Sequence, residues 1–318
     1  MLSATLASAG ALGVVSTASA QAYPSGIVKL VIPSAPGGSI DASGRLIADA
    51  LSRQLGTRVI VDNKAGAGGV IGIDNAAKSP ADGYTLVIGI AATLGVQPAV
   101  KKTMPYDTAR DIAPIGVFAQ GGLVMAVPVA SAVKTIQDFK VLSAGKGELK
   151  FGTGGQATFG HLTGEVMKAG LGVPMRHVPY KGSGPAVTDL AGGLLDFVIS
   201  DAFSATPYVQ SGKIRVIATA GPTRHVTFPD VPTLSESGLP FERGTWVGLF
   251  APAGVPAPVM AKLTSSFDAI TADAQFKTDL RKLGFTPVAV KANESKAMLL
   301  KDIDAWKQVA TAAGLQMQ

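Results

Sequence analysis

Residues 27–41 read IVKLVIPSAPGGSID, and this run combines a strand, a glycine turn and the start of a helix. Its β-branched first half predicts a buried strand. The pair Gly37-Gly38 allows a tight turn, and Ser39 is expected to act as the N-cap of an amphipathic helix over 40–55. A strand that enters a helix through a glycine turn is a building unit of α/β proteins.

Further units of the same kind follow directly. We predict strands over 57–61 and 84–90, and a helix over 70–78 behind the glycine-rich turn 66–69. The resulting β-α-β-α-β order implies a parallel sheet covered by helices.

The middle of the chain repeats this alternation and predicts a second α/β lobe. The C-terminal part offers one apolar strand, 246–251, and two or three helices, which is too little for a sheet of its own. It is therefore expected to return to the first sheet. The strands of the second lobe are expected at Leu123–Val127, Lys150–Thr153, Met175–Val178, Phe197–Ser200 and Ile214–Ala220.

This order places one lobe inside the other along the chain. The first lobe is predicted to comprise residues 23–123 plus 227–318, and residues 124–226 form the inserted second lobe. The chain would then cross twice between the lobes, as it does in hinged receptors that close around a ligand. The same arrangement occurs in many enzymes, so it does not settle the function.

Composition excludes several classes of protein. The 318 residues are too many for one typical core, and with 47% hydrophobic and 16% charged residues the chain is neither disordered nor a coiled coil. The net charge is +6, but the basic residues are scattered and aromatic residues are only 6%, so no nucleic-acid partner is expected. A mild basic excess fits an anionic ligand. Without cysteine, disulfides, thiolate metal sites and a cysteine nucleophile are excluded.

The first 22 residues predict export. They carry no charged side chain and end in Ala18-Ser19-Ala20-Gln21-Ala22, which holds two overlapping A-x-A cleavage patterns. This favours a secretory signal peptide cleaved after Ala20 or Ala22 over a poorly ordered helical N-terminus. No later segment offers about 20 continuous apolar residues, so a soluble, periplasmic mature protein is expected.

Two loops share the strand–glycine–helix design and are candidate anion sites. One is 33–41, and the other is 152–161 in the second lobe. Free N–H groups at a helix start, together with the helix dipole, attract a carboxylate. One such loop in each lobe would face a common cleft at the carboxyl ends of the strands. The alternative for each is an ordinary strand-to-helix turn.

Signatures of catalysis are missing. No G-x-S-x-G occurs, and His161, His177 and His225 lack the spacing of metal ligands, so no catalytic residue, metal or cofactor is expected. His177 is predicted to be structural and His225 exposed, whereas His161 is a candidate for the cleft. Asp41 is expected to organise its helix start, and Asp201 to fix the loop behind its strand.

The chain resembles the substrate-binding proteins of tripartite tricarboxylate transporters, the Bug family, over essentially its whole length after residue 22. The matching segments are Val31–Asp41, Gly66–Gly69, Asp82–Leu86, Met104–Asp107, His177–Gly182, Pro229–Thr233 and Leu249–Gly254.

The resemblance implies a two-lobed Venus-flytrap fold with a hinged cleft, the type II-like α/β fold of periplasmic-binding proteins. It also implies an extracytoplasmic receptor, usually monomeric, that delivers a small organic carboxylate to a membrane permease of one large and one small subunit. In this family the carboxylate is held largely by loop backbone groups and water. A sensor for a membrane signalling partner is the alternative, followed by a two-lobed enzyme.

The family's binding positions carry over residue by residue. They fall in four loops and correspond here to Ser34, Ala35, Gly37, Gly38, Ser39, Asp41, Ala91, Ala92, Thr93, Gly154, Gln156, Ala157, Thr158, Phe159, His161 and Asp201.

Two positions depart from the family pattern. Ser34 replaces an aromatic residue, and Phe159 replaces a small polar one. One hypothesis is a pocket suited to a ring-bearing or longer carboxylate over citrate. The alternative is that Phe159 packs into the core of its lobe.

Overall fold

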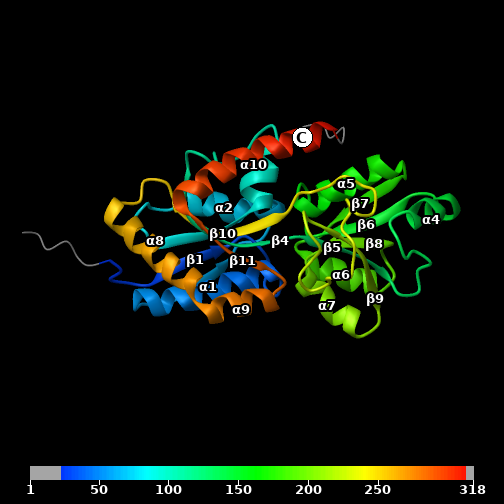
Figure 1. Ribbon diagram of the computed structural model, residues 1–318. Coiled ribbons are helices and arrows are strands. Elements are labelled where there is room, and N and C mark those ends of the chain that lie inside the picture. The colour runs from blue at the N-terminus through cyan, green and yellow to red at the C-terminus, as the bar shows by residue number, and fades with distance from the viewer. Residues whose placement is uncertain (1–22, 313–318) are drawn as a thin grey trace, which may run out of the picture.

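The protein has two α/β lobes that lie side by side along its long axis, as the computed structural model shows (Figure 1). The structure describes residues 23–312. The predicted signal peptide, residues 1–22, lies outside the described residues. Within 23–312, no helix is long and apolar enough to cross a membrane. We call the part built on the six-stranded sheet lobe 1 and the part built on the five-stranded sheet lobe 2.

The sheet of lobe 1 has the strand order β11-β4-β10-β3-β1-β2. The three N-terminal strands are parallel, as predicted, and the other three pair antiparallel, so the sheet is mixed. The C-terminal part does return to this sheet. The strands are β1 (Val28–Ile32), β2 (Val59–Asn63), β3 (Thr85–Ile90), β4 (Ile112–Gly121), β10 (Thr245–Pro252) and β11 (Thr286–Lys291).

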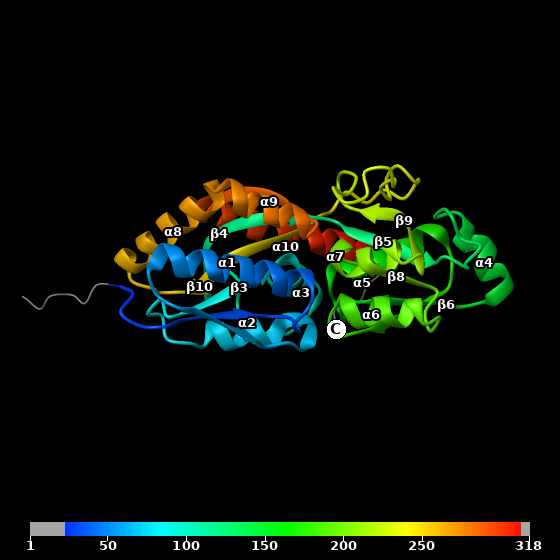
Figure 2. The ribbon, with the colours of Figure 1, turned by 90° about the horizontal axis from the view of Figure 1, so that it is seen from below.

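Helices cover both faces of this sheet. Successive side chains of β1 point to opposite faces, and both sets are buried under helices. Leu30 and Ile32 pack under α1 (Ser39–Leu55), α8 (Ala257–Ala272) and α9 (Ala274–Lys282). Val31 faces the opposite side. Figure 2 shows α1 and α2 on opposite sides of the sheet. The side of Val31 is covered by α2 (Val70–Ala77), the π-helix η2 (Ala92–Val96), α3 (Gln97–Val100) and α10 (Ala292–Ala312).

The start of α1 differs from the prediction. Its N-cap is Gly38, without a side-chain cap, and Ser39 is the first helical residue. The hydroxyl of Ser39 therefore does not satisfy the N–H groups of the first turn.

Lobe 2 is built on a five-stranded sheet of order β7-β6-β8-β5-β9. Phe139, Phe151 and Phe197 form the centre of its larger core. The strands are β5 (Leu123–Pro128), β6 (Leu149–Thr153), β7 (Met175–Pro179), β8 (Phe197–Ser200) and β9 (Ile214–Ala220), and the helices are α4 (Asp138–Lys146), α5 (Phe159–Leu171), α6 (Ser183–Ala191) and α7 (Ala202–Gln210).

The lobes are joined where the chain changes sheets. Gly122 alone separates β4 from β5, and a Cβ there would overlap the carbonyl oxygen of Ala220. The chain returns between β9 and β10 through residues 221–244, in which Thr233 bridges to Thr219 of lobe 2. The exact boundaries expected from the sequence stay predictions.

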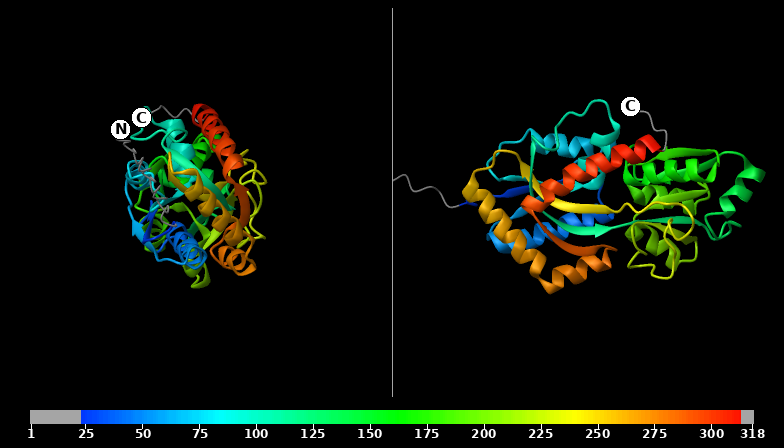
Figure 3. Two further views of the ribbon diagram at one scale, coloured as in Figure 1. Left: turned by 90° about the vertical axis from the view of Figure 1, so that its left-hand side faces the viewer. Right: turned by 45° about the horizontal axis from the view of Figure 1, so that its top comes forward.

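A third connection is the C-terminal helix, which the sequence does not assign to both lobes. Figure 3 shows α10 running along lobe 1 and ending against lobe 2. Its Trp306 is fully buried and meets the ring of Phe159 on α5 edge-on, with 5.5 Å between ring centroids. One apolar cluster therefore includes residues of both lobes.

Replacing Gly164 of α5 with alanine is expected to lower the free energy of unfolding by about 1–3 kcal/mol, because the added methyl would overlap the Phe151 ring. Gly145 of α4 is the matched control. A Cβ there meets nothing within 4 Å, so alanine should stabilise by up to about 1 kcal/mol through helix propensity. Urea denaturation measures both, and equal stability of the two variants would contradict this packing.

Candidate functional site

A cleft of about 480 Å³ lies between the two lobes. Three loops of lobe 1 line it, 33–40, 65–69 and 90–92, and each follows the carboxyl end of a parallel strand. Lobe 2 contributes loops that follow β6, β7 and β8 in the same way. The cleft therefore has the position of the ligand site in open α/β sheets.

The structure brings most of the predicted site residues to this cleft. The lining contains Ser34, Ala35, Gly37, Gly38, Ser39, Ala92, Gly154, Gln156, Thr158, Phe159 and Asp201. Asp41, Ala91, Thr93, Ala157 and His161 lie behind it and do not line it. Whether the lining residues bind a ligand stays a prediction at this point.

Asp41 organises the first loop, as the sequence predicts. Its carboxylate accepts hydrogen bonds from the Gly37 N–H at 3.0 Å, from Asn63 Nδ2 at 2.8 Å and from Arg45 Nε at 3.0 Å. Burial alone would raise the pKa of Asp41, but these hydrogen bonds outweigh it and hold the pKa below its ordinary value. The carboxylate therefore stays charged and fixes the turn in front of α1.

The helices that start at the cleft differ in how their first N–H groups are satisfied. In lobe 2, Thr158 caps α5, and His161 Nδ1 accepts the Ala157 N–H at 3.1 Å. Asp201 caps α7 through the Ser204 N–H at 2.8 Å. In contrast, α1, α2 and α6 begin behind Gly38, Gly69 and Gly182, which provide no side-chain cap. The helix start of lobe 2 that remains open at the cleft is thus that of α6, whereas the sequence points to α5.

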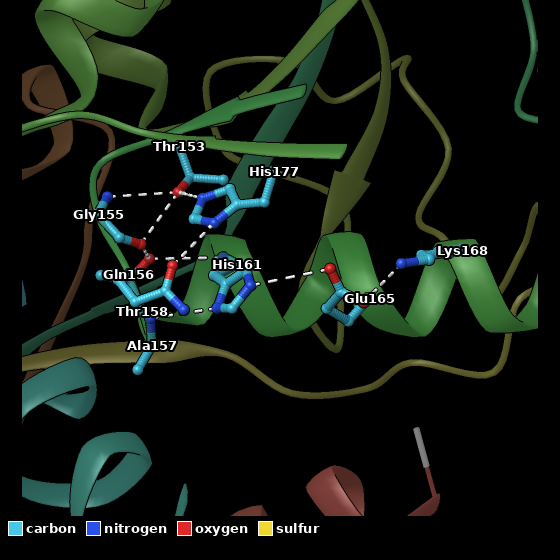
Figure 4. A network of polar contacts seen from close by, with 9 residues as sticks. All are labelled: Thr153, Gly155, Gln156, Ala157, Thr158, His161, Glu165, Lys168 and His177. Atoms are coloured by element: carbon cyan, nitrogen blue, oxygen red, sulfur yellow. Dashed lines mark hydrogen bonds and ion pairs between the residues drawn. The ribbon is translucent and has the colours of Figure 1, made fainter. Parts of the chain in front are cut away.

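A buried polar network supports the loop in front of α5 (Figure 4). The rings of His161 and His177 stack with 4.0 Å between centroids. His177 Nε2 contacts the Thr153 hydroxyl at 2.6 Å, and Nδ1 contacts Gln156 Oε1 at 3.2 Å. Since Gln156 lines the cleft, this network fixes part of its wall. His177 is structural, as predicted, and His161 belongs to the support behind the cleft.

The sequence predicts that His225 is exposed, and this prediction is wrong. His225 is buried, with 5% of its surface exposed, and it belongs to the cleft lining. Its Nδ1 accepts the Thr227 N–H at 3.1 Å. Burial lowers the pKa of His225, although the charge of Asp201 acts in the opposite direction. Residues next to a turn are usually exposed, but here the turn is folded back against lobe 1.

Two further loops were missed by the sequence analysis. Residues 179–185 line the cleft and contain Lys181, the only lysine or arginine that lines it among residues 23–312. Residues 283–285, between α9 and β11, line the end of the cleft next to Gly121 and Gly122, where the chain crosses between the lobes; we call this the hinge end. The segment 177–182 did stand out among the matching motifs, and its first two residues were predicted to end a strand, but the segment was not assigned to the cleft.

Phe159 combines both roles considered for it. It is 3% exposed and packs against Phe241 and Trp306. This agrees with the alternative that Phe159 is a core residue. It also contributes to the cleft lining. Ser34 lines the cleft with a hydroxyl that is buried and has no hydrogen-bond partner among the described residues.

Two glycines make close approaches at the edges of the cleft. A Cβ on Gly68 of lobe 1 would lie 2.8 Å from the carbonyl oxygen of Gln156. At the hinge end, a Cβ on Gly284 would lie 3.1 Å from the His225 ring. Both glycines therefore allow an approach that a larger residue would prevent.

Comparison with known proteins gives one consistent result. The family model "Tripartite tricarboxylate transporter family receptor" matches residues 44–315. A protein from the tcbD-tcbE intergenic region of Pseudomonas sp. strain P51 is 36% identical, over 91% of this chain and 86% of that protein. Protein BugT of Bordetella pertussis is 31% identical, over 96% of this chain and 95% of BugT.

Solved structures agree with the sequence relatives. The R. palustris protein Rpa4515, solved with adipate, has a TM-score of 0.88 and 31% identity, and the alignment covers 93% of this chain and all of that one. MatC from Rhodopseudomonas palustris, with bound malate, has a TM-score of 0.83 and 28% identity over 90% of this chain and 99% of MatC. The two-lobed α/β periplasmic-binding fold expected from the sequence is confirmed.

Acid is expected to destabilise the protein through the stacked histidines. Burial lowers the pKa of both His161 and His177 below 6.5, and Lys168 lowers that of His161 further. The unfolded chain therefore takes up these protons first, so stability is complete above the unfolded pKa and falls as the pH decreases through and below it.

Urea denaturation at about pH 7.5 and about pH 5 measures this loss. His161→Gln keeps an acceptor for the Ala157 N–H and removes one titrating group, so it should lose less stability than the wild type. The same loss in both proteins would contradict the assignment.

Proposed function

This chain belongs to the tripartite tricarboxylate transporter receptor family, and on that premise we propose that it captures a small organic carboxylate between its lobes and delivers it to a membrane permease. The family is one of receptors, which agrees with the expectation that the chain is not an enzyme. Its location in the periplasm and its monomeric state are part of the same proposal.

The observation that carries the proposal is the pair of open helix starts at the cleft. The helices α1 of lobe 1 and α6 of lobe 2 both begin behind a glycine without a side-chain cap, and both starts belong to the lining. Each leaves backbone N–H groups at the positive end of a helix dipole. These groups donate hydrogen bonds, and a carboxylate oxygen is a suitable acceptor because its negative charge also interacts favourably with the helix dipole.

The rest of the lining favours an elongated ligand with an apolar middle. Ile40, Ile90 and Leu123 add apolar side chains to the lining. Lys181 immediately precedes the start of α6 and adds the single positive side chain of the lining. A dicarboxylate could therefore place one end at α1 and the other at α6. The binding of adipate and of malate by two similar proteins supports this class of ligand.

Closure of the lobes would complete the site. In this structure Gly68 approaches the backbone of Gln156, so lobe 1 and lobe 2 are in contact across the cleft. A ligand that touches both lobes favours this state over an open one by its differential affinity. Receptor function thus requires contacts across the cleft as well as the anion sites.

Gly38→Val is expected to weaken carboxylate binding by roughly tenfold or more, because its side chain would occupy the approach to the α1 start. The fold should tolerate it, since a Cβ on Gly38 meets nothing within 4 Å and its φ of −91° suits valine. Melting temperatures with and without mono-, di- and tricarboxylates measure both effects. The proposed site would be contradicted if no carboxylate raised the melting temperature of the wild type, or if the variant showed the same rise as the wild type.

Gly68→Ala should hinder closure and reduce the affinity for the same carboxylate by roughly tenfold. The methyl would meet the Gln156 carbonyl of lobe 2, and also Gln97 Nε2, a side-chain end that can move. Gly56→Ala is the matched control: its φ of 68° resembles the 65° of Gly68, and nothing lies within 4 Å of its Cβ. Calorimetric titration measures both affinities, and equal values for the two variants would contradict the role of the Gly68 contact.

A further inference from the structure

A second large hollow lies on lobe 1, outside the cleft, and shares no residue with it. It has a volume of about 700 Å³ and runs between the segment 98–110 and the outer face of α10. We call it the α10 groove. The segment contains the motif Met104–Asp107, which belongs to the family resemblance but takes no part in the ligand site.

The α10 groove carries positive charge that the protein neutralises only in part. Lys101, Lys102, Arg110 and Lys307 all line it. Arg110 pairs with Asp111 at 2.7 Å, and Lys307 pairs with Asp304 at 3.3 Å. Lys101 and Lys102 take part in no ion pair with any residue of 23–312. Burial lowers the pKa of Lys101, so a nearby anion would relieve a charge that is partly removed from water.

One side of the groove is connected to the ligand cleft. The Tyr106 hydroxyl, at the base of the segment, donates a hydrogen bond to the carbonyl oxygen of Thr93 at 2.6 Å. Thr93 follows Ala92, which lines the cleft. Tyr106 is 5% exposed, so this bond is shielded from water and ties the segment to the cleft loop.

The other side of the groove is connected to lobe 2. Ile303 and Lys307 of α10 line the groove, and Trp306 between them packs on Phe159 of lobe 2. Phe159 also lines the cleft. Because Trp306 of α10 packs on Phe159 of lobe 2, a movement of lobe 2 relative to lobe 1 would act on α10 and on the groove that α10 lines.

We propose that the α10 groove is the docking surface for an acidic segment of the membrane permease, and that it presents its docking shape when the lobes are closed. The proposal rests on the proposed receptor function. The unpaired lysines provide charge complementarity to acidic side chains. A membrane surface fits less well, because the groove is concave and a narrow protein segment enters such a hollow more easily than a flat layer of headgroups.

The test uses the full-length mature receptor and the large and small permease subunits of the same organism, reconstituted in proteoliposomes. The double variant Lys101→Glu/Lys102→Glu should reduce receptor-dependent uptake of the carboxylate roughly tenfold or more. Its melting temperature should still rise with ligand as in the wild type, because neither lysine lies in the cleft. Lys140→Glu/Lys262→Glu, an equal change of charge at exposed positions on α4 and α8, should leave uptake within about twofold.

Each other outcome overturns the proposal in a recognisable way. Wild-type uptake by the Lys101/Lys102 double variant would show that the permease docks elsewhere. An equal loss in the Lys140/Lys262 control would show that only net charge matters. Binding of the wild type, but not of the Lys101/Lys102 double variant, to permease-free vesicles of anionic phospholipid would assign the groove to the membrane. A wild type without any carboxylate-dependent melting shift would refute the proposed function itself, and the docking proposal with it.

Discussion

The structure depends on helix starts that the protein itself leaves unsatisfied. The first N–H groups of a helix need partners, and a helix end that faces a closed site without them is costly. This chain satisfies α5 and α7 with Thr158 and Asp201 but leaves α1 and α6 open toward the same cleft. An anion placed between the lobes completes both helix ends at once, which links ligand binding to closure.

The surrounding residues serve this arrangement. The Asp41 carboxylate accepts a hydrogen bond from the Gly37 N–H and thereby fixes the turn before α1. The stacked rings of His161 and His177 support the cleft wall of lobe 2. Neither group reaches the cleft as a ligand contact. Their role is to keep the loops in place while the lobes move. If the proposed function holds, affinity depends mainly on backbone geometry, since few side chains in the lining carry charge.

The connection through α10 extends this account beyond the cleft. A helix that packs along lobe 1 and touches lobe 2 through Trp306 can transmit the state of the cleft to an outer surface. Such transmission requires two arrangements of the lobes that differ in free energy by only a few kcal/mol. In the arrangement described here, Gly68 of lobe 1 lies against the Gln156 backbone of lobe 2.

The sequence predicted the parallel strands and helices of both lobes because period-2 and period-3.6 patterns with glycine turns are local signals. It missed β4, whose Pro114 and Gly116 interrupt the pattern, and β11, a half-exposed edge strand. Most loop residues that the sequence assigned to the cleft do line it. Asp41 and His161 were also assigned to the cleft but do not line it, because a motif gives a residue's position in the chain and not the direction of its side chain. The roles of Lys181, His225 and the α6 start arise from tertiary packing and have no local signature.

The most direct test of the account compares the best-binding carboxylate with its methyl ester by calorimetric titration of the wild-type protein. The ester has nearly the same shape but no charge for the open helix starts to bind. The account predicts that the acid binds and that the ester binds at least roughly a hundredfold more weakly, as expected when a buried charge-assisted hydrogen bond is lost. Equal affinities would contradict the central claim, because recognition would then rest on the apolar part of the cleft.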